Sequence, residues 1–192
     1  MKHKFLKNKL AVFMMIFLIF ISAMIIYRVT SNAGDGETNT VRLVTSKGNI
    51  TIELYTDMPI TTTNFKKLVK QEIYDGTIFH RVVPGFVIQG GDPTGTGYGD
   101  SSIPTIKDEL PNRHSNVRGA VAMAKTSEPD SASSQFFINL VDNSASLDAN
   151  YTVFGYVTAG LGVVDMIGSV PTNTTTQSPL QEVQLIKAEF VH

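Results

Sequence analysis

Hydrophobic and polar residues alternate strictly in two short stretches of the first third of the chain. Ile50, Ile52 and Leu54 are each separated by a more polar neighbour, and a similar run extends over residues 41–45. A period of two is typical of a strand with one buried face. Residues 46–49, Ser-Lys-Gly-Asn, supply turn-forming residues between the two runs. The pattern therefore predicts a β-hairpin.

Further runs extend this pattern to a mainly β domain. Pro59 fits the first turn of a helix over residues 59–71, in which Phe65 and Leu68 share a face, and the apolar stretch 162–167 indicates a second, short helix. Six further runs raise the predicted number of strands to eight: residues 78–83, 86–89, 119–125, 135–141, 152–157 and 182–190. Eight strands, two helices and long loops predict a closed eight-stranded antiparallel barrel capped by two helices.

The most hydrophobic part of the chain lies near its N-terminus. Residues 10–27, LAVFMMIFLIFISAMIIY, contain no charged residue and are flanked by Lys9 and Arg28. As a helix this stretch would be about 27 Å long, close to the ~30 Å hydrocarbon core of a bilayer. Helices of globular domains rarely lack a polar face. We therefore expect one N-terminal hydrophobic helix at residues 10–28 that contacts a membrane, preceded by a basic cytoplasmic region at residues 1–9.

The charges beside this stretch predict its orientation. Four lysines precede it and one arginine follows it, which keeps the N-terminus in the cytoplasm and places the chain after residue 28 outside. The length favours a retained anchor, because signal-peptide cores usually have about 7–15 apolar residues. The small residues of Ser31-Asn32-Ala33 leave a cleaved signal peptide as the alternative. We expect an extracytoplasmic protein anchored in the cell membrane, or else one secreted after cleavage near Ala33.

Composition separates this leader from the rest of the chain. Residues 29–40 are small and polar and indicate a linker, which leaves residues 41–192 as one domain. Five of the 16 Lys and Arg and none of the 17 Asp and Glu lie in residues 1–34, so the remainder has a net charge of −6. An acidic domain lacks the clustered bases that bind nucleic-acid phosphates. The absence of cysteine excludes thiol catalysis and thiolate metal sites.

The densest group of chemically unusual residues lies in FHRVVPGFVIQGGDP, residues 79–93. If the Pro-Gly pair joins two adjacent strands, three of these side chains gather on one surface: Arg81, Phe86 and Gln89. On a later strand, alternation turns Gln135 and Phe137 toward the same side. An arginine and two glutamines among phenylalanines offer hydrogen-bond donors without a nucleophile.

Together with three later segments, this stretch resembles the motifs of the cyclophilin-type peptidyl-prolyl cis-trans isomerases. GAVAMAK, SQFFINL and VFGYV follow it in that family's order and near its spacing, and YDGTIFHR resembles the bacterial branch. Several separated motifs over residues 41–190 are more specific than one short pattern. The resemblance implies an eight-stranded antiparallel barrel with two capping helices, no cofactor, and proline-containing polypeptides as partners.

The resemblance also implies which residues form the site. Arg81 and Gln89 would be the catalytic polar pair. The apolar seat of the proline ring would consist of Phe86, Val87, Phe137 and Leu147. The groove for the substrate backbone would be lined by Ala124, Lys125 and Gln135, with Tyr151 beside the proline ring.

Several positions differ from the best-known eukaryotic members. Val87 stands where those members have Met, and Ser146 or its neighbour Ala145 where they have Trp. Tyr151 replaces a His but still offers a hydroxyl donor above an aromatic face. Lys125 replaces an Asn, which leaves open the preference for the residue before proline.

These residues suit an isomerisation, because that reaction breaks no covalent bond. Rotation about an X-Pro bond faces a barrier of ~18–20 kcal/mol, since amide resonance is lost. In the twisted transition state the prolyl nitrogen regains a lone pair, to which a nearby guanidinium can donate. We expect a monomeric isomerase that assists the folding of exported or cell-surface proteins. The alternative is a non-catalytic proline-binding scaffold or holdase chaperone that uses the same groove.

Other residues permit different chemistry. Alternation turns His80 away from Arg81, so we expect a packed structural histidine there. Ser133 or Ser134 with His80 could form a hydrolase triad, but the chain has no G-x-S-x-G nucleophile elbow. His114 lies in a polar stretch, and the histidines do not assemble the three or four ligands that a metal site requires.

Overall fold

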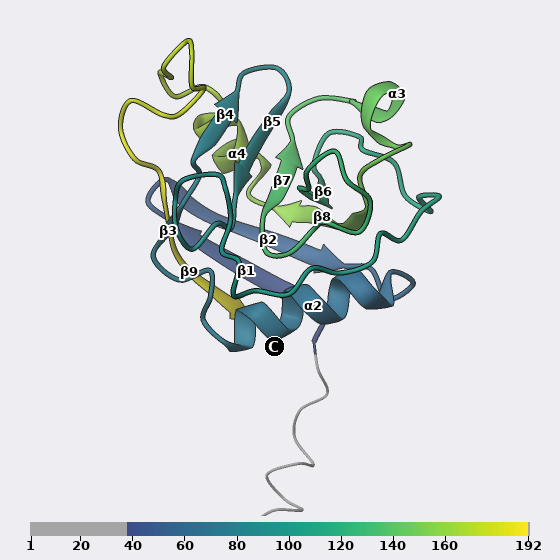
Figure 1. The fold of residues 1–192 in the computed structure, drawn as a ribbon. Coiled ribbons are helices and arrows are strands. Elements are labelled where there is room, and N and C mark those ends of the chain that lie inside the picture. The colour runs from purple at the N-terminus through teal and green to yellow at the C-terminus, as the bar shows by residue number, and fades with distance from the viewer. Residues whose placement is uncertain (1–37, 192) are drawn as a thin grey trace, which may run out of the picture. The chain divides into compact units, whose positions relative to one another are not determined.

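A curled antiparallel sheet forms the framework of the computed structural model, which describes residues 38–191 (Figure 1). The strands are β1 Thr40–Thr45, β2 Gly48–Leu54, β3 Thr77–Ile78, β4 Arg81–Val83, β5 Val87–Gly90, β6 Ala120–Met123, β7 Phe136–Asn139, β8 Val153–Ala159 and β9 Gln184–Phe190. They pair in the order β3-β9-β1-β2-β8-β6-β7-β5-β4. The predicted hairpin is confirmed, because β1 and β2 pair from Thr40 opposite Glu53 to Thr45 opposite Gly48. Thr40, assigned above to the linker, is therefore the first residue of β1.

The sheet differs from the predicted eight-stranded barrel. The predicted strand 78–83 is divided into β3 and β4, which gives nine strands in the described part of the chain. At the division the chain changes its pairing partner: β3 pairs with β9, the Phe79 N–H continues this pairing by donating to the Val183 carbonyl, and β4 pairs with β5. Within residues 38–191 the pairing order ends at β3 and β4, and only one bridge, between Ile78 and Asp92, connects β3 with the segment after β5. Closure as an eight-stranded barrel is therefore not confirmed, whereas the curled antiparallel sheet is.

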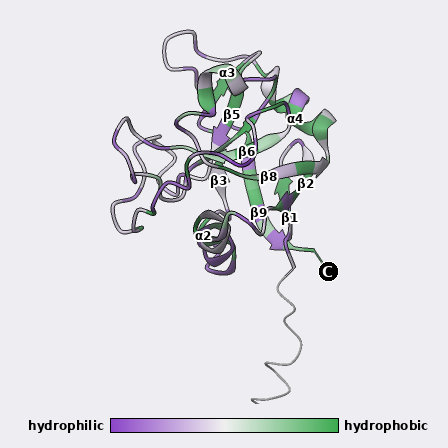
Figure 2. Cartoon of the chain, turned by 90° about the vertical axis from the view of Figure 1, so that its right-hand side faces the viewer, coloured by the Kyte–Doolittle hydropathy of each residue, from purple (hydrophilic) through white to green (hydrophobic). Residues whose placement is uncertain are grey.

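Helices pack at opposite ends of this sheet. α2 Pro59–Lys70 contacts β8 and β9, and α4 Leu161–Gly168 contacts β2, β4 and β5 (Figures 1 and 2). Both were predicted, at residues 59–71 and 162–167. A third helix, α3 Ser144–Leu147, was not predicted, because four residues are too few to display a helical period.

The predicted leader is not among the residues that the structure describes. The basic region at residues 1–9, the hydrophobic segment at residues 10–28 and nearly all of the linker lie outside the described residues. Among residues 38–191, no helix combines the length and the hydrophobicity that crossing a bilayer would require.

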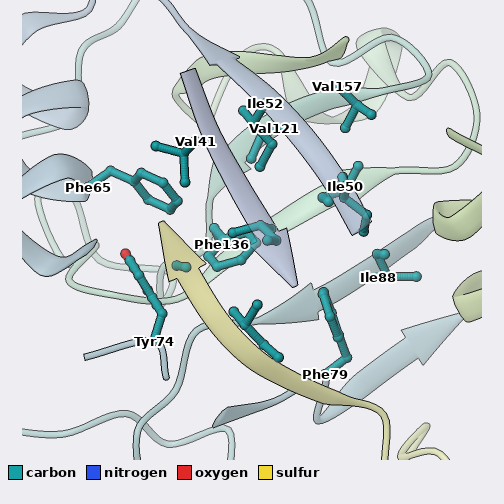
Figure 3. Packing of buried hydrophobic residues seen from close by; sticks show 14 of the residues in the cluster. Val41, Ile50, Ile52, Phe65, Tyr74, Phe79, Ile88, Val121, Phe136 and Val157 are labelled. Carbon is teal, nitrogen blue, oxygen red and sulfur yellow. The ribbon is translucent and has the colours of Figure 1, made fainter. Parts of the chain in front are cut away.

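The main hydrophobic core lies between α2 and the concave side of the sheet, and Figure 3 shows part of its packing. Phe65 of α2 is fully buried, with its ring centroid 4.9 Å from that of Tyr74 and 5.6 Å from that of Phe136. Ile50 and Ile52, whose alternation predicted the hairpin, are also fully buried. In Figure 2 the strands carry most of the hydrophobic colour, whereas the loops around them are largely hydrophilic.

The N-terminus of α2 is capped by a residue from a distant loop. Pro59 occupies the first turn, and the Glu109 carboxylate accepts hydrogen bonds from the N–H groups of Ile60 at 3.1 Å and Thr61 at 2.8 Å. An acid at this end of a helix is stabilising by about 0.3–1 kcal/mol, because it satisfies free N–H groups and complements the helix dipole. Because Glu109 belongs to the long segment between β5 and β6, these hydrogen bonds attach that segment to the helix.

Strand alternation gives the sheet a second, distinct hydrophobic face. Val82, Ile88 and Phe136 belong to the main core cluster, whereas Val87 and Phe137 belong to a separate cluster. Since successive side chains of a strand point to opposite faces, the second cluster lies on the side of β5 and β7 away from the core. The candidate site is built on this second face.

Candidate functional site

A pocket of about 300 Å³ opens on the second face of the sheet. Strands β4, β5 and β7, helix α3, the turn between β4 and β5 and the segments after β6 and α3 line it. The lining residues are Arg81, Phe86, Val87, Gln89, Ala124, Lys125, Phe137, Leu147 and Tyr151. The structure thus places together every residue of the predicted site except Gln135. Gln135 lies directly beside the pocket, as its contacts show below.

The apolar side of the pocket is a small, well-packed cluster. Val87, Phe137 and Leu147 are nearly completely buried, and Phe86 packs against them from the turn between β4 and β5. The ring of Tyr151 meets that of Phe137 edge to face, with centroids 5.6 Å apart and planes at 80°. This geometry is the favoured one for aromatic pairs. The cluster can receive a compact apolar ring while the mouth of the pocket stays open to an extended chain.

The polar side of the pocket follows from strand register. Arg81 of β4 lies opposite Gln89 of β5, and Gln89 lies opposite Phe137 of β7. Directly opposed residues have neighbouring side chains on the same face of a sheet. The register therefore sets a guanidinium, an amide and an aromatic ring in one row across three strands, with Arg81 at the edge strand.

A chain of hydrogen bonds fixes the orientation of this row. Arg81 Nη1 donates to Gln89 Oε1 at 3.4 Å, and Gln89 Nε2 donates to Gln135 Oε1 at 2.9 Å. Gln135 Nε2 donates in turn to the Gly97 carbonyl at 3.0 Å. Each amide presents its oxygen toward the arginine side, because its nitrogen has an acceptor on the other side. Gln135 is therefore a neighbour of the pocket that orients Gln89.

Arg81 has a further partner that the sequence did not indicate. Its Nε–H donates to the side-chain oxygen of Gln177 at 2.8 Å, which is shorter than its contact with Gln89. Gln177 lies in the loop between α4 and β9, within the polar stretch TNTTTQS. A glutamine in such a stretch carries no sequence signal that distinguishes it from a solvated loop residue.

A smaller pocket of about 140 Å³ adjoins the first and shares Gln89, Ala124 and Lys125 with it. Gln135, which was predicted to line the substrate groove, also lines this pocket. Its remaining walls come from two loops and were not predicted: Gly97, Tyr98, Gly99, Thr126, Ser131 and Ser133. The Tyr98 side chain is almost fully exposed. The two pockets form one continuous surface along which an extended peptide can lie.

The buried carboxylate of Asp92 shapes the loop that forms this second pocket. It accepts hydrogen bonds from the N–H groups of Thr94 at 2.9 Å, Gly97 at 2.6 Å and Gly99 at 3.2 Å. Burial raises the pKa of the Asp92 carboxyl, but these hydrogen bonds outweigh it and hold the pKa below the ordinary value. Gly91 starts the loop with φ +79°, and a Cβ there would lie 2.8 Å from Phe136 Cδ1, so the backbone passes β7 too closely for any side chain.

Lys125 is anchored at the boundary of the two pockets. Its Nζ forms an ion pair with Asp108 Oδ2, and both side chains are about nine-tenths buried, at 9% and 10% exposed. Asp108 also accepts from the Asp130 N–H at 3.1 Å. The lysine charge is thus balanced within the protein, so it adds little net positive field to the groove.

Buried asparagines hold the apolar seat in place. Asn143 Nδ2 donates to the Phe86 carbonyl at 3.0 Å and to Asn139 Oδ1 at 2.9 Å, which ties the turn after β4 to the start of α3. Asn112 Nδ2 donates to the Tyr151 carbonyl at 2.6 Å. Such supporting contacts were not predicted, because asparagine in a loop is equally common in exposed turns.

The remaining candidate residues take structural roles. His80 is 8% exposed, which confirms a packed histidine, and burial is the main cause that lowers its pKa from 6.5. Among residues 38–191 neither ring nitrogen of His80 nor the Ser134 hydroxyl has a hydrogen-bond partner, so no triad forms there. His114 Nε2–H donates a 2.9 Å hydrogen bond to the Asp57 carboxylate, and the His114 ring stacks on that of Tyr55 with centroids 3.7 Å apart. No group of three metal-ligating side chains occurs in that same range.

The two residues expected at the position of the eukaryotic tryptophan, Ala145 and Ser146, both lie in α3. Ser146 Oγ donates to the Asn143 carbonyl at 3.1 Å, and neither Ser146 nor Ala145 belongs to the lining of either pocket. Tyr151 and Val87, at two other positions that differ from the eukaryotic members, do line the main pocket.

Comparison with known proteins gives a consistent result. The sequence profile described as cyclophilin type peptidyl-prolyl cis-trans isomerase/CLD matches residues 40–190. A peptidyl-prolyl cis-trans isomerase of Acinetobacter baylyi is 46% identical over 158 residues, which cover 78% of this chain and 84% of that protein. One from Schizosaccharomyces pombe is 47% identical over 152 residues, covering 77% and 96%.

Solved structures agree with these relatives. The crystal structure of a cyclophilin-type isomerase of Cryptosporidium parvum, determined in the presence of the dipeptide Ala-Pro, is 31% identical and superposes with a TM-score of 0.74, covering 80% of this chain and 99% of that one. The fold, the row of polar residues beside an apolar seat and the sequence matches lead to the same assignment. This chain belongs to the cyclophilin-type peptidyl-prolyl cis-trans isomerase family.

Proposed function

We propose that this chain catalyses cis–trans rotation about X-Pro bonds in extended polypeptide segments, with Arg81 as the group that stabilises the transition state. The observation that carries the proposal is the position of Arg81. Its guanidinium lines the same pocket as Val87, Phe137 and Leu147, and the Gln89 and Gln177 side chains hold it there.

The mechanism requires a donor that acts only midway through the rotation. In the planar ground state the prolyl nitrogen lone pair is delocalised into the amide, so the nitrogen accepts no hydrogen bond. As the bond twists, the nitrogen becomes pyramidal and the lone pair returns, and the guanidinium donates to it. This interaction is stronger in the transition state than in the ground state and therefore lowers the barrier. A thousandfold acceleration needs about 4 kcal/mol, which one or two charge-assisted hydrogen bonds in a desolvated pocket can supply.

The other pocket residues bind and orient the substrate. The proline ring fits the apolar seat, where Tyr151 and Phe137 meet at 5.6 Å, and its burial there fixes the position of the nitrogen relative to Arg81. Gln89 orients the guanidinium through its side-chain oxygen and is itself oriented by Gln135. Residues before the proline lie along the groove that Ala124 and Lys125 line.

The proposed clients are exported or cell-surface proteins that fold outside the cytoplasm. The support is in the sequence: residues 10–27 form a long uncharged apolar stretch that four lysines precede and one arginine follows, which favours an anchor with the domain outside. We further propose that the chain is a monomer and belongs to the bacterial branch of the family; the YDGTIFHR motif is the support for the branch.

The test replaces Arg81 with Ala in the full chain. We expect the rate enhancement on a short Pro-containing peptide to fall by about a hundredfold or more, because a charged donor to the transition state is lost. Gln177 and Gln89 stay in place, so circular dichroism and the denaturation midpoint should remain those of the native chain. Undiminished catalysis by a folded Arg81→Ala variant would contradict the proposed mechanism.

The scaffold or holdase alternative is not favoured, since the matched relatives are named as isomerases and the hydrogen-bond chain from Arg81 through Gln89 to Gln135 is intact. Exchange NMR on an Ala-Pro peptide separates the two functions. Line broadening from cis–trans exchange at substoichiometric protein means turnover, whereas shifted resonances without faster exchange mean binding alone.

A further inference from the structure

We infer that Gln177 is a positioning residue for the isomerase: it holds the Arg81 guanidinium at the angle that the reaction requires. The inference rests on the proposed role of Arg81 and adds to it a residue from a segment distant in sequence. The loop between α4 and β9 thereby becomes a functional part of the site, although none of its residues lines either pocket.

The first argument is the quality of the contact. The 2.8 Å hydrogen bond from Arg81 Nε to Gln177 Oε1 has the length of a strong N–H···O bond, whereas the Arg81 Nη1 contact with Gln89 Oε1 is 3.4 Å and weak. Rotation of the guanidinium about its side-chain axis moves the Nε–H. A partner on Nε therefore fixes the plane of the group, which the long Nη1 contact alone does not.

The second argument is that Gln177 accepts two hydrogen bonds from β4. Its backbone carbonyl accepts a 2.8 Å hydrogen bond from the Val82 N–H, while its side chain accepts from Arg81. β4 is an edge strand that pairs with β5 on one side only. Gln177 thus occupies the open edge of the strand that carries the catalytic arginine, and its position is coupled to the backbone of that strand.

The third argument is the backbone conformation of Gln177. Its φ is +61°, in the left-handed region that glycine adopts without strain and that other residues adopt only at an energetic cost. The loop holds it there, since the Gln177 N–H donates to the Asn173 carbonyl at 2.8 Å and the Asn173 N–H donates to Ser178 O at 2.8 Å. A loop that needed only this turn would be served better by Gly or Asn. Gln supplies what they lack, a side-chain oxygen that reaches the guanidinium.

The fourth argument is charge. Both side-chain acceptors of Arg81 are neutral amides, and among residues 38–191 no carboxylate lies within ion-pair distance of it. A carboxylate would also hold the guanidinium, but it would offset the positive charge that stabilises the prolyl lone pair. A neutral partner on Nε fixes the geometry and leaves the charge, the Nη2 donors and one Nη1 donor free for the substrate.

The test compares two variants of the full chain that remove the acceptor in different ways. Gln177→Gly relieves the strained backbone and deletes the side chain, and Gln177→Met keeps the length of the side chain without the amide. The matched control is Glu72→Gly, which makes the same backbone change at an exposed residue outside the site, with φ +57°. We expect both Gln177 variants to lower kcat by about tenfold, with KM within twofold, because the apolar seat is unchanged. The control should keep the wild-type kcat.

Two further readouts separate positioning from a merely structural role. The Arg81 Nε–H resonance in a ¹H–¹⁵N spectrum should be sharp in the wild-type chain and exchange-broadened in Gln177→Gly. In an Arg81→Ala background, Gln177→Gly should cause no additional loss, because the residue acts only through the guanidinium. If Arg81→Ala abolishes catalysis while the Gln177 variants retain full kcat and a sharp Nε–H signal, the positioning role is wrong and the proposed function stands. If Arg81→Ala remains fully active, the proposed mechanism itself fails.

Discussion

His80 and Arg81 are consecutive in the chain, yet the strand break between β3 and β4 gives them opposite environments. Arg81 lines an open pocket and keeps free donors, whereas His80 is buried with no hydrogen-bond partner for either ring nitrogen in the described part of the chain. A buried imidazole without partners is stable only in its neutral form. Of the two residues, Arg81 therefore supplies the positive charge of the pocket. His80 instead makes the stability of the fold depend on pH.

His80 makes the free energy of unfolding depend on pH near neutrality. Burial lowers its pKa below 6.5, Arg81 lowers it further, and Asp92 opposes both. As the pH falls below 6.5, His80 of the unfolded chain binds a proton before His80 of the folded chain does. The contribution of neutral His80 to stability is therefore fully present above pH 6.5 and is lost as the pH falls toward the lower pKa of the folded state. In His80→Gln this dependence should shrink.

Urea unfolding between pH 7.5 and 5.0 measures the effect. The slope of the unfolding free energy, at most ~1.4 kcal/mol per pH unit for one group, should be steeper in the wild-type chain than in His80→Gln. Equal slopes in the two proteins would show that His80 does not titrate differently in the folded state.

At the scale of elements, the site depends on which strands and loops lie side by side. The register of β4, β5 and β7 aligns Arg81, Gln89 and Phe137, and the segment after β6 brings Lys125 to the boundary between the pockets. The long loop before β6 supplies Asp108, the partner that balances the Lys125 charge. The groove is thus assembled from strands and loops that are distant in sequence and that local sequence patterns do not bring together.

The Lys125–Asp108 pair should couple the groove to the stability of the fold. Asp108→Asn leaves an ammonium about nine-tenths buried without its counter-charge, and breaking a buried pair from one side costs about 3 kcal/mol or more. Lys125→Met should destabilise comparably, whereas the double variant Lys125→Met/Asp108→Asn should regain most of the loss because no unpaired charge remains. Urea denaturation of the three variants tests this coupling. Additive losses in the double variant would mean that the two side chains do not interact.

At the scale of the whole molecule, residues Asn39–His192 form a self-contained unit. The sheet, its two end helices and both pockets lie within it, and the family profile matches residues 40–190. The hydrogen bonds and ion pairs described for the site all join residues of this unit. The leader is therefore expected to decide where the enzyme acts, and the domain how it acts.

Deletion of residues 1–37 should leave catalysis unchanged and abolish membrane association. We expect kcat/KM on a Pro-containing peptide to stay within twofold of the full chain, while the protein moves from the membrane fraction to the soluble fraction on cell fractionation. Mass spectrometry of the mature full-length protein distinguishes an anchor from a signal peptide, since Gly34 as the first residue means cleavage. A truncated chain that is folded but inactive would contradict the separation of roles.

Much of the architecture was predictable because it depends on short-range patterns. The period of two at Ile50 and Ile52 predicted the hairpin, and Pro59 with Phe65 predicted α2. Alternation along residues 135–137 also assigned Gln135 and Phe137 to one side. The short strand at 78–83 was predicted as continuous, because the break at Phe79 and His80 arises from pairing with the distant segment at Val183. The nine-stranded order could not be derived from local pattern for the same reason.

Local sequence determined the identity of the chemical groups: an arginine and glutamines among aromatic residues, on strands whose alternation selects a common face. Tertiary structure alone decided how the arginine is held. The Nε acceptor comes from Gln177 in a loop whose sequence resembles any polar turn, and the counter-charge of Lys125 comes from Asp108 in another loop. Side-chain hydrogen bonds and ion pairs between distant segments depend on register, sheet curvature and backbone conformation together, and these arise only when the whole sheet has formed.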